Sequence, residues 1–222
     1  MDWPALWLSL RLGVLTVAVL LPVAIIAGRW LAYRQFAGKP AVEALVALPL
    51  VLPPTVFGYY LLTAFGAGSP IGALWSSAFG QPLVFTFEGL LVASIIVNLP
   101  FAIQPSQRGF EAIPREVRDA AACSGMTPWR AFLRIELPLA WPGLLTAAVL
   151  SFAHTLGEFG VVLMIGGSIP GDTKTMAIAI YDRVQAFDDA AAAHMSLLLL
   201  VLSLAAITVT LTLSRRVGRR LG

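Results

Sequence analysis

Charged residues are scarce in this chain of 222 residues. Only 12 % of the residues are Asp, Glu, Lys or Arg, whereas 58 % are hydrophobic. Soluble domains carry about 25 % charged residues, which keep their surfaces hydrated. The composition therefore excludes a soluble globular domain and indicates a protein embedded in a membrane.

Other residues and motifs are also missing. The single cysteine, Cys123, excludes an intrachain disulfide, and His154 and His194 are the only histidines, which is a poor ligand set for a metal. The chain has no GxxxxGK[ST] motif, since Gly38-Lys39 is followed by proline, so we expect no nucleotide site or other cofactor on it. It also lacks Ser/Gly linkers and fixed-period repeats, which favours one domain, residues 1–222.

Long apolar runs take the place of these features. A membrane-spanning helix needs about 20 mostly apolar residues. Five segments meet this requirement: Leu12 to Tyr33, Val42 to Phe65, Leu83 to Gln104, Pro142 to Ile165, and Ala191 to Ser214. The sequence therefore predicts an all-α integral membrane protein with about five spans.

The basic residues predict its orientation. With five spans, twelve of the fifteen Lys and Arg residues fall on one side of the membrane: Arg29, Arg34, Lys39, Arg108, Arg115, Arg118, Arg130, Arg134, Arg215, Arg216, Arg219 and Arg220. The positive-inside rule places that side in the cytoplasm, with the N-terminus outside and the C-terminus inside. Because these residues flank spans and do not form a basic face interleaved with aromatics, no nucleic-acid partner is expected.

A polar loop at residues 105–141 interrupts the apolar sequence on the expected cytoplasmic side. Arg115 to Ser124 is rich in helix formers, and Gly125 offers the left-handed residue that closes a helix. Thr127 and Pro128 are typical of the cap and first turn of a second short helix, which we expect to end near Leu137-Pro138. Ala120 and Ala121 give the first helix a small face suited to docking into a groove on a partner.

This loop resembles the EAA loop of ABC importer permeases, with Asp where Glu is usual. The residues that match are Asp119, Ala120, Ala121, Gly125, Ile135, Leu137 and Pro138. The resemblance implies the type I permease fold and a coupling role for these residues. It also implies a non-catalytic subunit whose ATP and magnesium are bound by a separate cytoplasmic ATPase.

Further segments resemble the molybdate and tungstate permeases of that family. They are Leu48 to Tyr59, which contains LPLVLPP, Thr155 to Gly160, and Gly167 to Thr175. The resemblance implies a homodimer in the bacterial inner membrane, a cytoplasmic ABC ATPase dimer, and an extracytoplasmic oxyanion-binding protein. Sulfate or thiosulfate permeases, which are usually longer, are the alternative.

The second span contains three prolines, Pro49, Pro53 and Pro54. Each removes a backbone donor, and in lipid such breaks are tolerated only against protein or a water-filled cavity. This span is therefore expected to line a pathway, although a simple structural kink would use the same residues. Thr55 and Tyr59 lie four apart and could offer hydroxyls to an oxyanion or to neighbouring helices.

The fourth span carries an ionisable pair, His154 and Glu158, with Ser151 and Thr155 nearby. Such a pair indicates either a pathway or gate, or a packed structural pair. Asn98 precedes Leu99-Pro100, where we expect it to satisfy a freed carbonyl.

No Lys or Arg lies mid-membrane, so the pathway is expected to bind anions weakly. The outer loop from Gly166 to Ala190 is then the candidate docking or gate segment. Two other classes stay open: a membrane-embedded enzyme that uses His154 and Glu158 as acid and base, and a secondary transporter.

Overall fold

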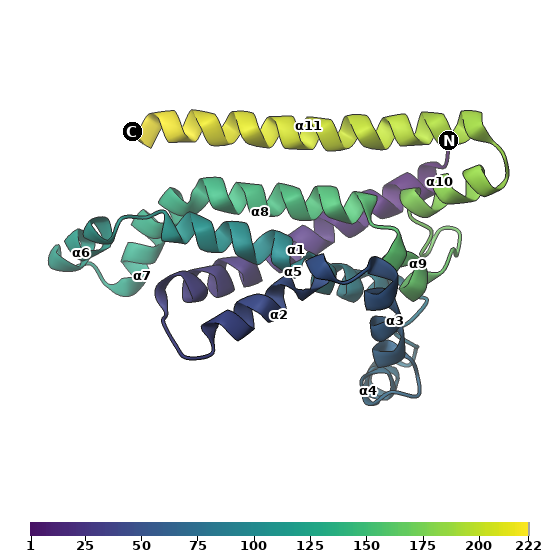
Figure 1. The fold of residues 1–222 in the computed structure, drawn as a ribbon, viewed down its shortest axis with the longest axis horizontal. Coiled ribbons are helices and arrows are strands. Elements are labelled where there is room, and N and C mark those ends of the chain that lie inside the picture. Colours follow the sequence, from purple (N-terminus) through teal and green to yellow (C-terminus); the bar gives the residue numbers. More distant parts are fainter. Residues whose placement is uncertain (222) are drawn as a thin grey trace.

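The computed structural model describes the backbone of residues 1–221 and the side chains of residues 1–209 and 212. Helices and short connections account for this whole range, without a strand (Figure 1). The helices are α1 Trp3–Tyr33, α2 Lys39–Val51, α3 Pro54–Phe65, α4 Pro70–Phe79, α5 Phe87–Glu111, α6 Arg115–Cys123, α7 Pro128–Ala131, a π-helical turn η1 Phe132–Glu136, α8 Leu137–Gly157, α9 Gly160–Gly166, α10 Met176–Gln185 and α11 Asp189–Leu221. The predicted all-α membrane class is confirmed.

Four helical segments are long and apolar enough to cross a bilayer: α1, α5, the continuous run Pro128–Gly157, and α11. They correspond to the first, third, fourth and fifth predicted spans. α1 begins well before the expected Leu12, because Asp2 caps it by accepting a hydrogen bond from the backbone N–H of Ala5 and Pro4 occupies its first turn. α5 packs against both α1 and α8 and forms the centre of the bundle.

The second predicted span, Val42 to Phe65, is not one helix. It divides into α2 and α3, which meet at an angle of 110°. The backbone turns at Leu52, which is extended with φ −74° and ψ 138°, as expected for a residue that precedes proline. The predicted break is therefore confirmed, but α3 and α4 turn away from the bundle (Figure 1).

The fourth predicted span, Pro142 to Ile165, is wrong at both ends. Its helix starts at Pro128 and passes through the π-turn, where the Leu137 N–H donates to the Phe132 carbonyl, directly into α8. The expected helix end at Leu137-Pro138 is therefore also wrong, because Pro138 lies in the first turn of α8, where no N–H is needed. At the other end α8 stops at Gly157, and the extended Glu158 separates it from α9.

Glycines allow the central helices to approach closely. A Cβ on Gly143 of α8 would lie 2.6 Å from the Pro105 carbonyl oxygen of α5, and one on Gly28 of α1 would lie 2.8 Å from the Gln107 nitrogen. Both are contacts with backbone atoms, which cannot move aside. Small residues are the usual means of packing helices in lipid.

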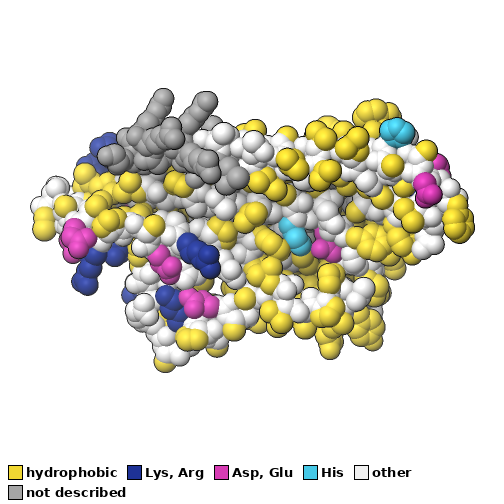
Figure 2. Space-filling model, turned by 45° about the horizontal axis from the view of Figure 1, so that its top comes forward, with side chains coloured by type: hydrophobic (Ala, Val, Ile, Leu, Met, Phe, Trp, Pro, Cys, Tyr) yellow, Lys and Arg dark blue, Asp and Glu magenta, His cyan; other side chains and the backbone are white. Residues whose placement is uncertain are grey.

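The two chain ends point to opposite ends of the bundle. The C-terminal end of α11 lies at the end that holds α6 and α7, and the N-terminus lies at the other (Figure 1). The Lys and Arg side chains visible in Figure 2 gather toward the α6 end. The one complete helix within residues 166–190 is α10, whose 10 residues are too few to cross a bilayer.

This arrangement predicts the outcome of a labelling experiment. Cysteines introduced singly at Arg130 and at Ser168, in a chain in which Cys123 is replaced, should react with an impermeant thiol reagent from opposite sides of the membrane. Both positions are exposed and lie at opposite ends of the bundle. Reaction of both cysteines from the same side would reject the five-crossing orientation.

Candidate functional site

The polar loop has the two-helix form expected from its sequence. Gly125 closes α6 in the left-handed conformation, with φ +72°. The N–H of Met126 donates to the Ala121 carbonyl at 3.2 Å, and the N–H of Gly125 donates to the Ala122 carbonyl at 3.0 Å. This pair of hydrogen bonds is a Schellman motif. Thr127 then caps α7 by accepting from the Arg130 N–H. The predicted closing glycine and the predicted cap are confirmed.

The residues of the loop that match the permease motif differ in exposure. Asp119, Ala120, Gly125 and Pro138 are exposed, whereas Ile135 and Leu137 are half-buried. Ala121 is only 4 % exposed. The small face expected at Ala120 and Ala121 is therefore divided: Ala120 is free to meet a partner, and Ala121 packs inside this chain.

Glu136, which lies between the motif positions Ile135 and Leu137, is a functional candidate that the motif does not reveal. Its carboxylate accepts two hydrogen bonds from Arg29 of α1, from Nε to Oε2 at 2.5 Å and from Nη2 to Oε1 at 3.2 Å. The side chain of Glu136 is 7 % exposed and that of Arg29 is 37 % exposed. The ion pair thus joins the end of the loop to the first span.

Aromatic rings extend this connection. The Arg29 guanidinium lies 5.3 Å from the ring centre of Phe132 in the π-turn, and Arg118 of α6 lies 4.0 Å from the ring centre of Tyr33. The Tyr33 hydroxyl donates to the Phe110 carbonyl at the end of α5 at 3.2 Å. These contacts link α6 and the π-turn to α1, and α1 to the end of α5. Cation–π contacts and hydrogen bonds of this kind are stronger where water is excluded.

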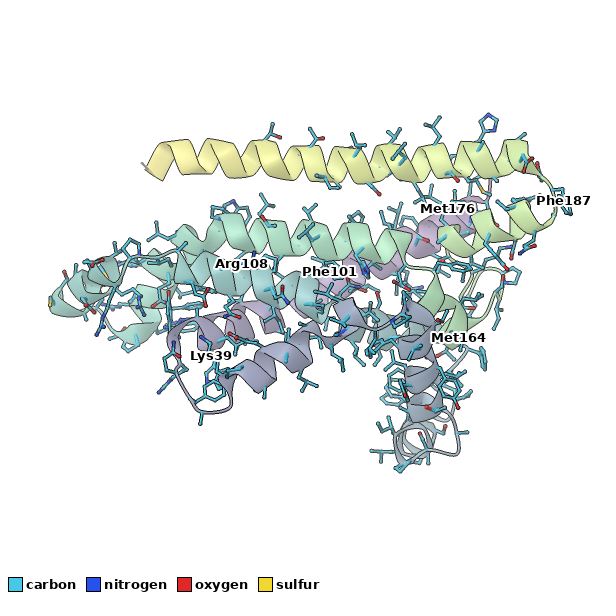
Figure 3. All side chains as sticks on the ribbon, in the orientation of Figure 1. Lys39, Phe101, Arg108, Met164, Met176 and Phe187 are labelled. Carbon is cyan, nitrogen blue, oxygen red and sulfur yellow. The ribbon has the colours of Figure 1, made fainter. Side chains whose placement is uncertain are left out.

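A second group of candidate residues lies where two helix breaks meet. A Cβ on Gly160, at the start of α9, would lie 2.8 Å from Cβ of Pro54, and one on Gly58 of α3 would lie 3.0 Å from Met164 of α9. Figure 3 places Met164 beside α3. The break between α2 and α3 is thus covered by the break between α8 and α9.

Glu158 occupies the second break. The Val161 N–H donates to its Oε1 at 2.9 Å, so the carboxylate caps α9. Its Oε2 lies 3.7 Å from Nε2 of His154. Glu158 is 8 % exposed, which means that the chain itself supplies most of its surroundings.

Asn98 connects α5 to α8 in the interior. Its amide nitrogen donates to the Ser94 carbonyl at 2.8 Å and to Thr155 Oγ1 at 3.0 Å, and its amide oxygen lies 3.2 Å from His154 Nδ1. Pro100 has no N–H, so the carbonyl that it leaves free is that of Ile96, four residues earlier. Asn98 donates instead to the Ser94 carbonyl, and its expected role at the kink is therefore wrong. Ser151, 1 % exposed, holds a hydroxyl without a hydrogen-bond partner among the described residues.

The remaining candidates lie outside this network. Pro53, Pro54, Thr55 and Tyr59 are all exposed, and the backbones of Pro54 and Thr55 lie beside Gly160. Tyr59, 56 % exposed, contacts only the ring of Tyr60 among the interactions of the described residues, with ring centres 6.0 Å apart. The structure thus joins Asn98 to Thr155 directly and to Glu158 through His154. The hydroxyls of Thr55 and Tyr59 make no hydrogen bond among the described residues.

Long apolar helices, a bent span whose break meets the break after α8, and a loop of short helices at one end define a multi-pass membrane transport component. The chain belongs to the family of binding-protein-dependent transport system inner membrane components, whose model matches residues 21–221. Members of this family are permease subunits, a class of non-catalytic membrane component.

Three relatives illustrate the similarity. The molybdenum transport system permease protein ModB of Azotobacter vinelandii is 49 % identical over 191 residues, which cover 86 % of this chain and 84 % of that protein. ModB of Escherichia coli K12 is 36 % identical, covering 83 % and 80 %. The sulfate transport system permease protein CysT of the same organism is 34 % identical, covering 86 % of this chain but 69 % of its own length.

Solved structures share the fold. A bacterial alginate ABC transporter in complex with an alginate-bound periplasmic protein has a TM-score of 0.74 at 18 % identity, covering 96 % of this chain and 78 % of that one. The MetNI methionine ABC transporter in an inward-facing conformation has a TM-score of 0.67 at 16 % identity, covering 97 % and 94 %. The predicted ABC importer permease fold is confirmed.

The buried ion pair generates the first prediction from this site. Glu136→Ala leaves Arg29 without its carboxylate, and we expect it to lower the free energy of unfolding by about 1–3 kcal/mol. Arg115→Ala is the matched control, because it removes a pair whose side chains are 83 % and 67 % exposed and should cost less than about 0.5 kcal/mol. Unfolding of the detergent-solubilised chain measures both. Equal stability of the two variants would contradict the role of Glu136.

Glu158 generates the second prediction. Glu158→Gln keeps an oxygen that accepts from the Val161 N–H, whereas Glu158→Ala leaves that buried donor unpaired and should cost about 1–3 kcal/mol. We expect the Gln variant to be fully stable but altered in transport or in its coupling to ATP hydrolysis. Wild-type stability, transport and coupling in the Gln variant would remove Glu158 from the functional residues.

Proposed function

We propose that this chain is the transmembrane subunit of an ATP-driven importer for molybdate, with tungstate as an alternative cargo. The observation that carries the proposal is the 49 % identity with a molybdenum permease over nearly the whole of both chains. The sulfate permease is 34 % identical to this chain, and the match covers 69 % of the sulfate permease, against 84 % of the molybdenum permease. Sulfate or thiosulfate import is the second candidate.

The working assembly in this proposal contains two copies of the chain with the pathway between them. A cytoplasmic ABC ATPase dimer, which holds ATP and magnesium, docks on the loop at 105–141, and an extracytoplasmic binding protein delivers the anion. The similar fold of a transporter that was solved with a periplasmic protein supports such a partner. The assembly lies in a bacterial inner membrane, with the N-terminus outside and the C-terminus inside, which accords with the basic residues at the α6 end.

The contacts of the loop suggest how ATP drives transport. ATP binding closes the ATPase pair and draws the two copies of α6 together. Because Arg29 holds Glu136, and Arg118 lies over Tyr33, movement of α6 is passed to α1 and α8 as a rigid unit. The helices then open the outer end of the pathway, and hydrolysis resets them.

The outer end is gated, in this proposal, where the two helix breaks meet. The exposed Thr55 and Tyr59 line the pathway together with Pro53 and Pro54. The hydrogen bonds from Asn98 to Thr155 and from Thr155 to the Ser151 carbonyl hold the wall in place. Glu158 shapes the gate and does not bind cargo, since a carboxylate repels a dianion. The outer segment 166–190 is the candidate surface for the binding protein.

Reconstituted uptake tests the function. Proteoliposomes that contain the chain, its ATPase and the binding protein should accumulate molybdate only with ATP. Tungstate should compete strongly and sulfate weakly. Uptake driven by an ion gradient without ATP would indicate a secondary transporter, and chemical turnover without an ATPase would indicate an enzyme. Preferred uptake of sulfate would select the second candidate.

The exposed face of α6 generates a further prediction. Ala120→Trp places a large side chain on the proposed docking face, and Gly125→Val puts a β-branched residue at φ +72°. Both variants should lose most ATP-dependent uptake and most of the ATPase that co-purifies with the chain, while the membrane bundle stays folded. Cys123→Ser, an exposed conservative change on the same helix, is the control. Wild-type uptake and co-purification in the Trp variant would contradict docking at α6.

A further inference from the structure

A groove runs along the bundle between α5 and α8. Its cavity has a volume of about 580 Å³, and Leu50 of α2 lines one side of it. Most of the lining residues come from one face of α5 and one face of α8, at positions or adjacent pairs of positions that repeat about once per helical turn. They are Pro100, Phe101, Gln104, Pro105, Arg108, Gly109 and Ala112 of α5, and Pro142, Gly143, Thr146 and Leu150 of α8.

One end of the groove reaches the interior network. The ring of Phe101, which lines the groove, stacks on that of His154 with ring centres 4.1 Å apart. His154 in turn lies beside Asn98 and Glu158. Figure 3 shows Phe101 near the middle of α5 and Arg108 nearer the α6 end. The groove therefore leads from the proposed gate toward the proposed cytoplasmic mouth.

Arg108 lies at the α6 end of the groove and carries a positive charge that no carboxylate of the described residues neutralises. Its side chain is exposed and forms no ion pair with any residue that the structure describes. Gln104, one helical turn away on the same face, has an amide that makes no hydrogen bond within that part of the chain. A guanidinium and an amide thus offer several N–H donors to the same cavity.

Two carboxylates lie in the neighbouring cavity, which shares Gln104 and Arg108 with the groove. Both are held by other residues: Gln107 Nε2 donates to Glu43 at 2.8 Å and to Glu111 at 2.9 Å, and Lys39 lies 3.8 Å from Glu43. Their charge, together with the negative end of the α5 dipole, weakens binding of an anion at Arg108. A weak site suits a position from which an anion must leave.

We propose that Arg108 and Gln104 form a low-affinity site for a tetrahedral oxyanion dianion at the inner mouth of the groove, where the cargo pauses before release. The inference rests on the proposed function for the identity of the cargo. The guanidinium matches an oxyanion bidentately, as it matches carboxylate and phosphate. Phe101, Pro105 and Leu50 provide apolar walls that keep the anion at the two polar side chains.

Direct binding tests the site. The full-length chain in nanodiscs of phosphatidylcholine is dialysed against tungstate, and bound tungsten is counted by mass spectrometry. Loss of a charge-assisted contact corresponds to about tenfold or more in affinity, so Arg108→Gln should weaken binding by at least that factor. Arg108→Lys should retain part of it. Arg34→Gln, which removes another exposed arginine outside the groove, should bind as the wild type does.

Several results would overturn the inference. Absence of saturable tungstate binding to the wild-type chain contradicts the site, and so does binding of tungstate by Arg108→Gln that is as tight as that of the wild type. An equal loss of tungstate binding in Arg34→Gln would show that surface charge alone attracts the anion. Loss of binding when phosphatidylglycerol replaces a third of the lipid would assign Arg108 to a lipid phosphate. ATP-dependent uptake by proteoliposomes that contain the wild-type chain, its ATPase and the binding protein separates these failures from a failure of the proposed function.

Discussion

A backbone that leaves the helical form inside a bilayer must be covered by protein, because lipid offers it no hydrogen bonds. Here two such breaks cover each other. A Cβ on Gly58 of α3 would lie 3.0 Å from Met164 of α9, and one on Gly160 of α9 would lie 2.8 Å from Pro54 of α3, so these glycines allow the close approach. Glu158 accepts a hydrogen bond from the buried N–H of Val161. The two non-helical breaks are thus gathered in one place, while the π-turn at Phe132–Glu136 keeps the run Pro128–Gly157 helical.

The two ends of the bundle are built differently. The end with the paired breaks relies on close backbone packing and one buried carboxylate, whereas the α6 end relies on arginines that contact a carboxylate and aromatic rings. Packed glycines resist deformation, and the Arg29–Glu136 pair fixes α1 to the π-turn. Force applied at α6 would therefore move whole helices, and the paired breaks would be the place where they separate.

The sequence predicted much of this architecture and missed particular parts of it. Composition revealed the membrane class, the prolines at 49–54 revealed one break, and Gly125 revealed the end of α6. The second break was missed because no proline marks it, and its only local signs are Gly157 and Gly160. Glu136 was missed because its partner Arg29 lies 107 residues away, and such a distant pairing is not visible in one sequence. The available signal was Arg29, an ionisable residue within the first apolar run.

In the proposed mechanism, the two copies of α6 approach each other while the paired breaks of the two copies separate. Spin labels on cysteines introduced at the exposed Asp119 of α6 and at the exposed Ile169, in the connection between α9 and α10, would report the distances between the two copies of the proposed dimer. These elements lie at opposite ends of the bundle (Figure 1). When a non-hydrolysable ATP analogue binds the complete transporter, the account predicts a shorter distance at 119 and a longer one at 169. Unchanged distances, or changes of the same sign at both ends, would contradict it.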